Sequence, residues 1–156
     1  MPELPIRSTL VILYVLRPTA EGHEVLLLKR TTTLAGEWCQ ISGRIEGEEK
    51  AWATALRELR EETGLEAEAL YLTDFCQTYY GQTLENVNIA PVFVAYVASD
   101  AAVELNFEHS DFKWASFDEA ADMVPYGGQR QALKFIEDEY SKRQPTKYLA
   151  VDLSRA

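Results

Sequence analysis

The chain has 156 residues, of which 47% are hydrophobic, and a formal net charge of -10 at pH 7. This length and composition predict a single domain over residues 1–156 with one sizeable core. The acidic balance disfavours a nucleic-acid partner, which would need a basic face. A small-molecule polyphosphate is compatible with it, because a metal ion held by acidic residues makes a local cationic receptor.

The first expected elements are two strands. An apolar run from Ser8 to Leu16 indicates a buried strand, and a turn at Pro18 to Gly22 leads into a second strand from His23 to Arg30. The run is too short to cross a membrane and lacks the basic lead and cleavage site of a signal peptide, so we expect no membrane partner and a cytoplasmic location. Lys29 and Arg30 are candidates for contacts with substrate phosphate, and a solvated strand end explains them equally well.

The most informative element is an expected helix from Glu48 to Thr63, a segment without Gly or Pro and rich in helix formers. Glu58, Glu61 and Glu62 have the i, i+3, i+4 spacing that stacks side chains on one face. The neighbouring stripe is apolar and consists of Trp52, Ala55, Leu56 and Leu59. Carboxylates so close together repel one another, and a hard divalent cation would neutralise them. A solvated acidic face is the alternative.

The stretch from Gly43 to Leu65 resembles the signature of the Nudix hydrolase family. The family pattern is G, five residues, E, seven residues, R-E-U-x-E-E-x-G-U, where U is a bulky aliphatic residue. Every fixed position is filled, by Gly43, Glu49, Arg57, Glu58, Leu59, Glu61, Glu62, Gly64 and Leu65. The resemblance implies an α/β/α sandwich with a mixed central sheet. It also implies a pyrophosphohydrolase that uses Mg²⁺, with Mn²⁺ as the alternative ion.

The resemblance further assigns roles to individual residues. It implies metal binding by the Gly43 carbonyl and by the carboxylates of Glu58, Glu61, Glu62 and Glu108. The catalytic candidates are Glu58, Glu61 and Glu108; the general base is Glu58 or Glu108, and the sequence does not separate these two.

Three other residues of the signature are expected to have structural roles. Glu49 and Arg57, two turns apart on one side of the expected helix, would form a bracing ion pair. Gly64 would adopt the left-handed conformation that ends the helix. Gly43 itself would end the strand-like run Trp38–Ile41 and turn the backbone tightly.

The remaining elements are shorter. We expect strands at Ala67–Leu72, Asp74–Tyr80, Ile89–Ala98 and Val103–Phe107, a polar loop at Gly81–Val87, and helices at Phe117–Met123 and Gln129–Arg143. The tail from residue 147 to 156 is interpreted as an edge strand, a subunit contact of a homodimer or a frayed end. Cys39 and Cys76 match no metal or redox spacing, so both are expected to be reduced core residues.

A second stretch narrows the resemblance. The run from Glu108 to Trp114 reads E-H-x-x-x-K-W. Together with the Trp38-Gln40-Gly43 lead into the signature and with Arg130-Gln131, it resembles the bacterial dihydroneopterin triphosphate pyrophosphatases. Diadenosine tetraphosphate hydrolases have a similar stretch. The resemblance implies cleavage of dihydroneopterin triphosphate to the monophosphate and pyrophosphate, with Gln40 in the substrate site. Aromatic residues that would suit the ring are Tyr79, Tyr80, Phe93, Tyr96 and Trp114, although each is better explained as core.

Three alternatives remain. The substrate could be a nucleoside triphosphate or a dinucleoside polyphosphate, because these fit similar pocket walls. The chain could be a non-catalytic sensor with the same fold, against which the intact set of glutamates argues. Removal of a 5′ diphosphate from RNA would need a basic approach surface, which the charge balance does not favour.

Overall fold

The structure is a computed structural model that describes residues 2–156. Its eight strands form one sheet in the order β1-β7-β2-β3-β4, with β5 paired to β2, β6 to β7 and β8 to β3. The strands are β1 (Ile6–Arg7), β2 (Leu10–Thr19), β3 (Gly22–Arg30), β4 (Trp38–Cys39), β5 (Ile41–Arg44), β6 (Ala69–Gly81), β7 (Asn86–Tyr96) and β8 (His109–Ala115). The helices are α1 (Ala51–Thr63), α2 (Phe117–Met123) and α3 (Gly127–Ile136), and a π-helical turn (Glu137–Ser141) continues α3.

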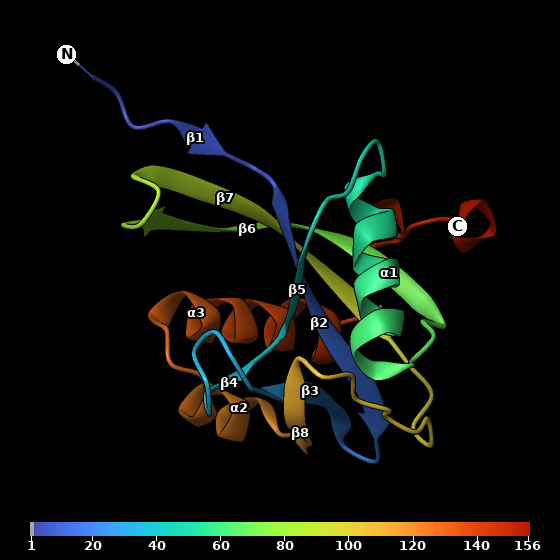
Figure 1. Ribbon diagram of the computed structural model, residues 1–156. Coiled ribbons are helices and arrows are strands. Elements are labelled where there is room, and N and C mark those ends of the chain that lie inside the picture. The colour runs from blue at the N-terminus through green and yellow to red at the C-terminus, as the bar shows by residue number, and fades with distance from the viewer. Residues whose placement is uncertain (1) are drawn as a thin grey trace.

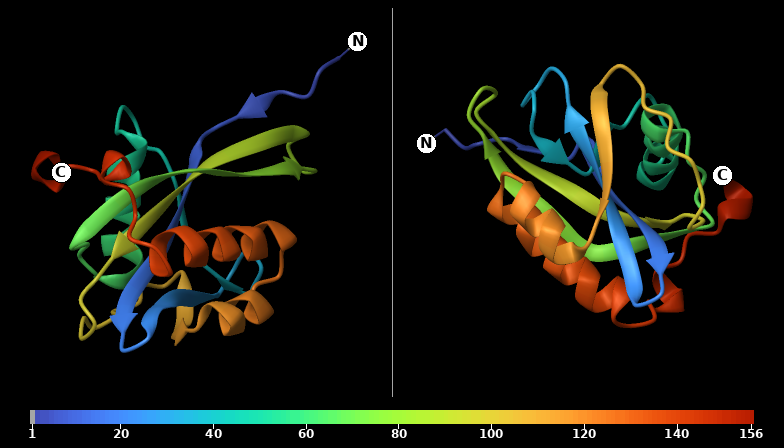
Figure 2. Two further views of the ribbon diagram at one scale, coloured as in Figure 1. Left: turned by 180° about the vertical axis from the view of Figure 1, so that it is seen from behind. Right: turned by 90° about the horizontal axis from the view of Figure 1, so that it is seen from below.

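The sheet lies between two helical layers, with α1 on one face and α2 and α3 on the other (Figures 1 and 2). Strand β2 explains this arrangement, because its side chains alternate between the two faces. Ile12 and Tyr14 pack in the core under α2 and α3, whereas Val11 and Leu13 pack in the core under α1. Both faces of β2 are therefore buried, as its continuous apolar sequence predicts.

Strand β2 also makes the sheet mixed. It pairs in parallel with β7 along one edge, and in antiparallel fashion with β5 and then β3 along the other. The expected α/β/α sandwich with a mixed sheet is thus confirmed.

The regular elements after the signature are found with shifted bounds. The two strands expected between Ala67 and Tyr80 are one strand, β6, with an irregularity between Leu72 and Cys76. Helix α2 has the expected bounds, and α3 begins two residues before the expected Gln129. The expected turn at Pro18 to Gly22 is tighter, because Pro18 still pairs with His23 inside the β2–β3 hairpin.

Two expectations in this region are wrong. Val103–Phe107 is not a strand; it crosses the end of α1, where the Glu104 amide donates to the Thr63 carbonyl at 2.8 Å. Cys76 is exposed, whereas Cys39 is buried as expected. The reason is the alternation of β6: Phe75 packs against Phe135 of α3, so Cys76 faces the opposite side of an edge strand.

The tail is ordered against the body. It forms 3-10 turns at Lys147–Leu149 and Leu153–Arg155. Within residues 2–156, its only β-bridge to a strand joins Ala150 to Tyr71 of β6. Val151 and Leu153 pack against the core under α1, and Figure 1 shows the C-terminus beside that helix. The homodimer contact stays a prediction. Within residues 2–156, no helix combines the length and apolar character needed to cross a bilayer.

Candidate active site

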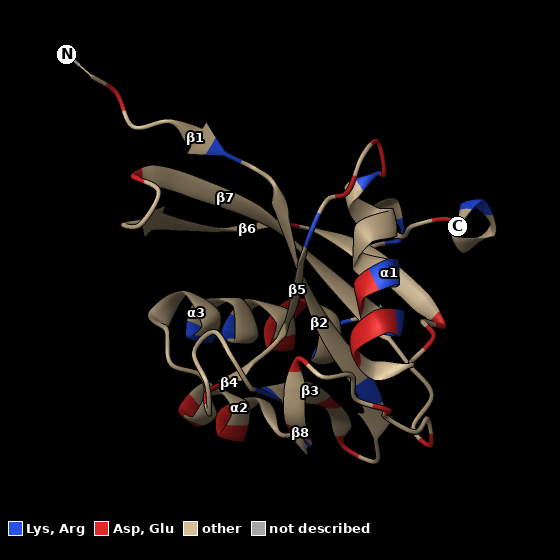
Figure 3. Cartoon of the chain, in the orientation of Figure 1, with Lys and Arg blue, Asp and Glu red and all other residues tan. Residues whose placement is uncertain are grey.

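Helix α1 positions the acidic residues of the site. Its apolar face, which includes Ala55 and Leu59, is buried against the sheet. The helix ends at Gly64, whose φ of 70° is left-handed and whose amide donates to the Arg60 carbonyl at 2.9 Å. The expected cap is therefore confirmed. The acidic and basic residues of α1 gather on its C-terminal part (Figure 3).

Gly43 brings strand β5 against this helix. It lies inside β5, paired with Val11, and its φ is not positive, so the expected turn at this position is wrong. The glycine is required for another reason: a Cβ atom here would overlap the carboxyl group of Glu58. The missing side chain lets the Glu58 carboxylate lie directly against the strand backbone.

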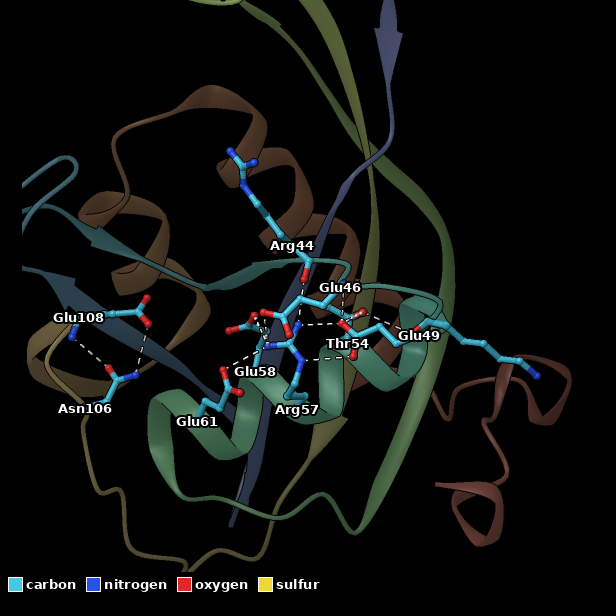
Figure 4. Close-up of polar contacts among 10 residues, drawn as sticks. Arg44, Glu46, Glu49, Thr54, Arg57, Glu58, Glu61, Asn106 and Glu108 are labelled. Carbon is cyan, nitrogen blue, oxygen red and sulfur yellow. Dashed lines mark hydrogen bonds and ion pairs between the residues drawn. The ribbon is translucent and has the colours of Figure 1, made fainter.

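Arg57 holds the carboxylates in place (Figure 4). Its Nη2 and Nε donate to Glu49 at 2.7 and 3.2 Å, and its Nη2 also donates to the Arg44 carbonyl at 2.8 Å. Its Nη1 donates to Glu58 at 2.8 Å and to Glu61 at 3.1 Å. Glu49 lies before the helix rather than on it, since α1 starts at Ala51. The ion pair is present nonetheless, because the forked guanidinium reaches back across the loop.

The three buried or braced carboxyl groups have very different proton affinities. The hydrogen bonds from Arg57 hold the pKa of Glu49 down to about 2. Burial raises the pKa of Glu58, although Arg57 opposes that effect. Burial, followed by the charges of Glu58 and Glu108, raises the pKa of Glu62 to about 9. Without a cation, Glu62 therefore keeps its proton at neutral pH, because its charged form is disfavoured where water is scarce.

Glu62 is the group that most clearly lacks a partner. The residue is 3% exposed, and in the described chain Glu62 Oε2 and His109 Nδ1 are the buried side-chain polar atoms without a hydrogen bond. An orphaned, buried carboxylate oxygen beside a second carboxylate is a suitable ligand for a hard cation. The donor set therefore fits a divalent metal ion.

The structure does not assemble a complete ligand set. No three His, Cys, Asp or Glu side chains of residues 2–156 are arranged around one ion position. Arg57 occupies one oxygen each of Glu58 and Glu61. Glu108 is exposed and bonds Asn106 at 3.4 Å, yet its charge acts on Glu58 and Glu62. The five metal ligands and the choice of catalytic glutamate stay predictions.

A cavity of about 690 Å³ is lined by Arg30 and by residues of β2, β4, β6 and the start of α3. None of the α1 carboxylates lines it, although the charge of Arg30 acts on Glu62. Among the expected substrate-binding residues, Arg30 and Gln40 line it. Lys29 does not; its Nζ lies 5.9 Å from the Trp38 ring. Arg30 is oriented by its own loop, where its Nε donates to the Thr33 carbonyl at 2.6 Å.

The aromatic candidates separate into two groups. Tyr79 and Tyr80 line the cavity and are exposed, so their interpretation as core is wrong. Phe93 is buried core, Tyr96 donates to the Tyr140 carbonyl at 2.7 Å, and Trp114 stacks under Arg17 at 4.6 Å.

Sequence reasoning missed other lining residues, notably Gln77, Tyr126 and Gln129. No local pattern marks them: even the Gly127-Gly128 pair is not required by the approach of α3 to β6, because a Cβ at Gly128 would lie at an ordinary contact distance of 3.8 Å from the Gln77 amide nitrogen.

Known proteins resemble this chain in sequence and in fold. The model of the NUDIX domain family matches residues 7–138. An asymmetrical bis(5'-nucleosyl)-tetraphosphatase from Caenorhabditis elegans is 24% identical over 123 residues, which cover 78% of this chain and 88% of that protein. The structure of the E. coli dihydroneopterin triphosphate pyrophosphohydrolase superposes with a TM-score of 0.68 at 19% identity, covering 85% of this chain and 97% of that one. This last likeness concerns the fold.

A longer protein is also similar. An octanoyltransferase from Myxococcus xanthus is 32% identical over 132 residues, which cover 83% of this chain. The chain spans only 36% of the length of that relative.

Proposed function

The chain belongs to the NUDIX family of hydrolases, and we propose that it is a divalent-metal-dependent pyrophosphohydrolase that cleaves a diphosphate linked to another moiety. The observation that supports this most is the buried pair Glu58 and Glu62. One oxygen of Glu62 has no hydrogen-bond partner among residues 2–156, and the Glu58 carboxyl group occupies the space that a Cβ at Gly43 would fill. Such an arrangement is costly for folding alone, because buried like charges repel.

The residues of the site would have different roles. A bound Mg²⁺, or Mn²⁺, held by Glu58, Glu62 and the Gly43 carbonyl with Glu61 and Glu108, would offset phosphate charge and acidify a bound water. Arg57 fixes the carboxylates through its bidentate contact with Glu49. A carboxylate oxygen of Glu58 or Glu108 takes the proton of the attacking water.

For the substrate we propose dihydroneopterin triphosphate, cleaved to the monophosphate and pyrophosphate. The support is the Glu108–Trp114 stretch and the cavity lined by Arg30 and Gln40, which offers Trp38, Tyr79 and Tyr80 to a flat ring. A planar heterocycle favours such apolar and aromatic walls with few polar groups.

A dinucleoside tetraphosphate is the second candidate. It is favoured by the similarity to the tetraphosphatase of C. elegans, which extends over most of that protein. The cavity walls alone do not separate a pteridine from a purine.

A turnover comparison tests the substrate. The specificity constant kcat/KM is measured with Mg²⁺ for dihydroneopterin triphosphate, nucleoside triphosphates, nucleotide sugars and dinucleoside tetraphosphates. We expect the pteridine to be preferred by at least about tenfold, or about 1.4 kcal/mol of transition-state binding. Preference for another compound would refute the substrate and retain the hydrolase, whereas a folded protein without any turnover would favour a sensor.

A further inference from the structure

Two glutamine side chains in the cavity are held in fixed orientations. Gln40 leads from β4 into β5, Gln77 belongs to β6, and both line the cavity together with Gln129 of α3. A glutamine amide has an accepting oxygen and a donating nitrogen. Which of the two faces a ligand depends on the partners that occupy the other end.

The orientation of Gln40 follows from a backbone amide. The N–H of Tyr126 donates to Oε1 of Gln129 at 3.0 Å, and a backbone N–H cannot act as an acceptor. The nitrogen of Gln129 is therefore on its other side, where it donates to Oε1 of Gln40 at 2.9 Å. Gln40 and Gln129 are 7% and 6% exposed, so this pair is well fixed. Because Gln129 uses the oxygen of Gln40, the NH₂ group of Gln40 is free to bind a ligand.

The orientation of Gln77 follows from a buried phenol. Tyr14 is fully buried, and its hydroxyl donates to Oε1 of Gln77 at 3.1 Å. Burial keeps the pKa of Tyr14 far above its ordinary value, so that the hydroxyl keeps its proton. A buried hydroxyl needs an acceptor, and the Gln77 oxygen is the one it has. The NH₂ group of Gln77 is left over, next to Gly128.

Both NH₂ groups are open to the cavity. Neither has a protein acceptor in the described part of the chain. Neither is among its buried polar atoms without a partner, which are Glu62 Oε2 and His109 Nδ1. Solvent therefore reaches both nitrogens. The cavity therefore presents two hydrogen-bond donors. Tyr126, through Gln129, fixes the orientation of the Gln40 donor, and Tyr14 fixes the orientation of the Gln77 donor.

We propose that Gln40 and Gln77 select the heterocycle of the substrate, and that they accept a ring whose edge carries a carbonyl oxygen beside an unprotonated ring nitrogen. Guanine has this edge in O6 and N7, whereas adenine places an amino donor beside N7. A 4-oxopteridine has the same edge as guanine. Gln129 acts as a positioning residue, because it sets the polarity of Gln40. The inference rests on the proposed function only in taking the cavity as the place of the substrate ring.

The test measures equilibrium binding of GMP and AMP to the full chain without metal, so that it needs no turnover. We expect the wild type to bind GMP at least about tenfold more tightly than AMP. Gln40→Glu keeps the oxygen that Gln129 needs and replaces the donor by an acceptor. The ratio of GMP to AMP affinity should fall by at least about tenfold.

A second variant tests the positioning role. In Gln129→Glu the side chain accepts from Tyr126 and has no donor for Gln40, so Gln40 turns over and presents its oxygen to the cavity. The affinity ratio should fall as in Gln40→Glu, whereas a merely structural role would weaken both nucleotides alike. Gln131→Glu is the matched control, because it adds the same charge on an exposed position of α3 and should leave the ratio unchanged.

The outcomes separate this inference from the proposed function. Equal wild-type affinity for GMP and AMP, no binding of either at millimolar concentration, or an unchanged ratio in Gln40→Glu would each overturn the inference. A protein without turnover on any phosphate compound would overturn the proposed hydrolase, while the binding ratios would still report on the glutamines.

Discussion

Replacing Glu62 by Gln is expected to stabilise the metal-free protein near neutral pH and to lower its activity sharply. The carboxyl group is buried, and its pKa is raised to about 9. Between its ordinary pKa near 4.5 and about 9, the folded state holds a proton that the unfolded state has lost. Because the folded pKa is the higher one, the free energy of unfolding falls as pH rises through this window.

The magnitude follows from the width of that window. From pH 4.5 to pH 7 the free energy of unfolding should fall by up to about 3 kcal/mol, at about 1.36 kcal/mol per pH unit. The amide of the Glu62→Gln variant cannot ionise, so that variant should lose much less stability over the same range. Its turnover should fall by on the order of 10³-fold, since the proposed metal site loses a carboxylate.

Denaturant unfolding in chelator at pH 5, 6, 7 and 8 measures the effect. Glu68→Gln is the control. Because Glu68 is exposed, its replacement should leave the dependence of the unfolding free energy on pH unchanged. If Glu62→Gln loses stability with pH as steeply as the wild type, the burial argument for Glu62 is wrong.

Three further predictions concern the neighbouring residues. Arg57→Ala should lower both Tm and kcat, because it frees Glu49 and Glu58; lower kcat at unchanged Tm would instead place Arg57 in the chemistry. Gly43→Ala should cost about 1–3 kcal/mol in denaturant unfolding, because the new Cβ overlaps Glu58; a cost near zero would contradict the close approach. In a thiol-labelling assay, exposed Cys76 should react in the native protein and buried Cys39 only on unfolding, and simultaneous reaction would refute this.

The sequence predicts those features that are local or periodic. Helix α1 could be placed because its apolar stripe recurs at helical spacing and Gly64 can end it in a left-handed conformation. Strand β2 could be recognised as buried because its apolar run is continuous. The signature added the fold and the identity of the acidic site.

Other features depend on contacts between segments far apart in the chain. The role of Gly43 requires knowing that Glu58 packs onto it, which no local pattern contains. Cys76 lies in an apolar-looking strand, but its exposure is decided by which face of β6 α3 covers. The cavity joins Gln40 to Gln129, which are separated by 89 positions, and sequence spacing gives no measure of such a contact.

The claim that the acidic site performs metal-dependent hydrolysis is tested most directly by pyrophosphate release from dihydroneopterin triphosphate. It is measured with Mg²⁺ and with chelator, for the wild type and for folded Glu62→Gln. Release that requires the cation and is lost in the variant is the predicted result. Release that continues unchanged in chelator, or in the folded variant with Mg²⁺, would contradict the account.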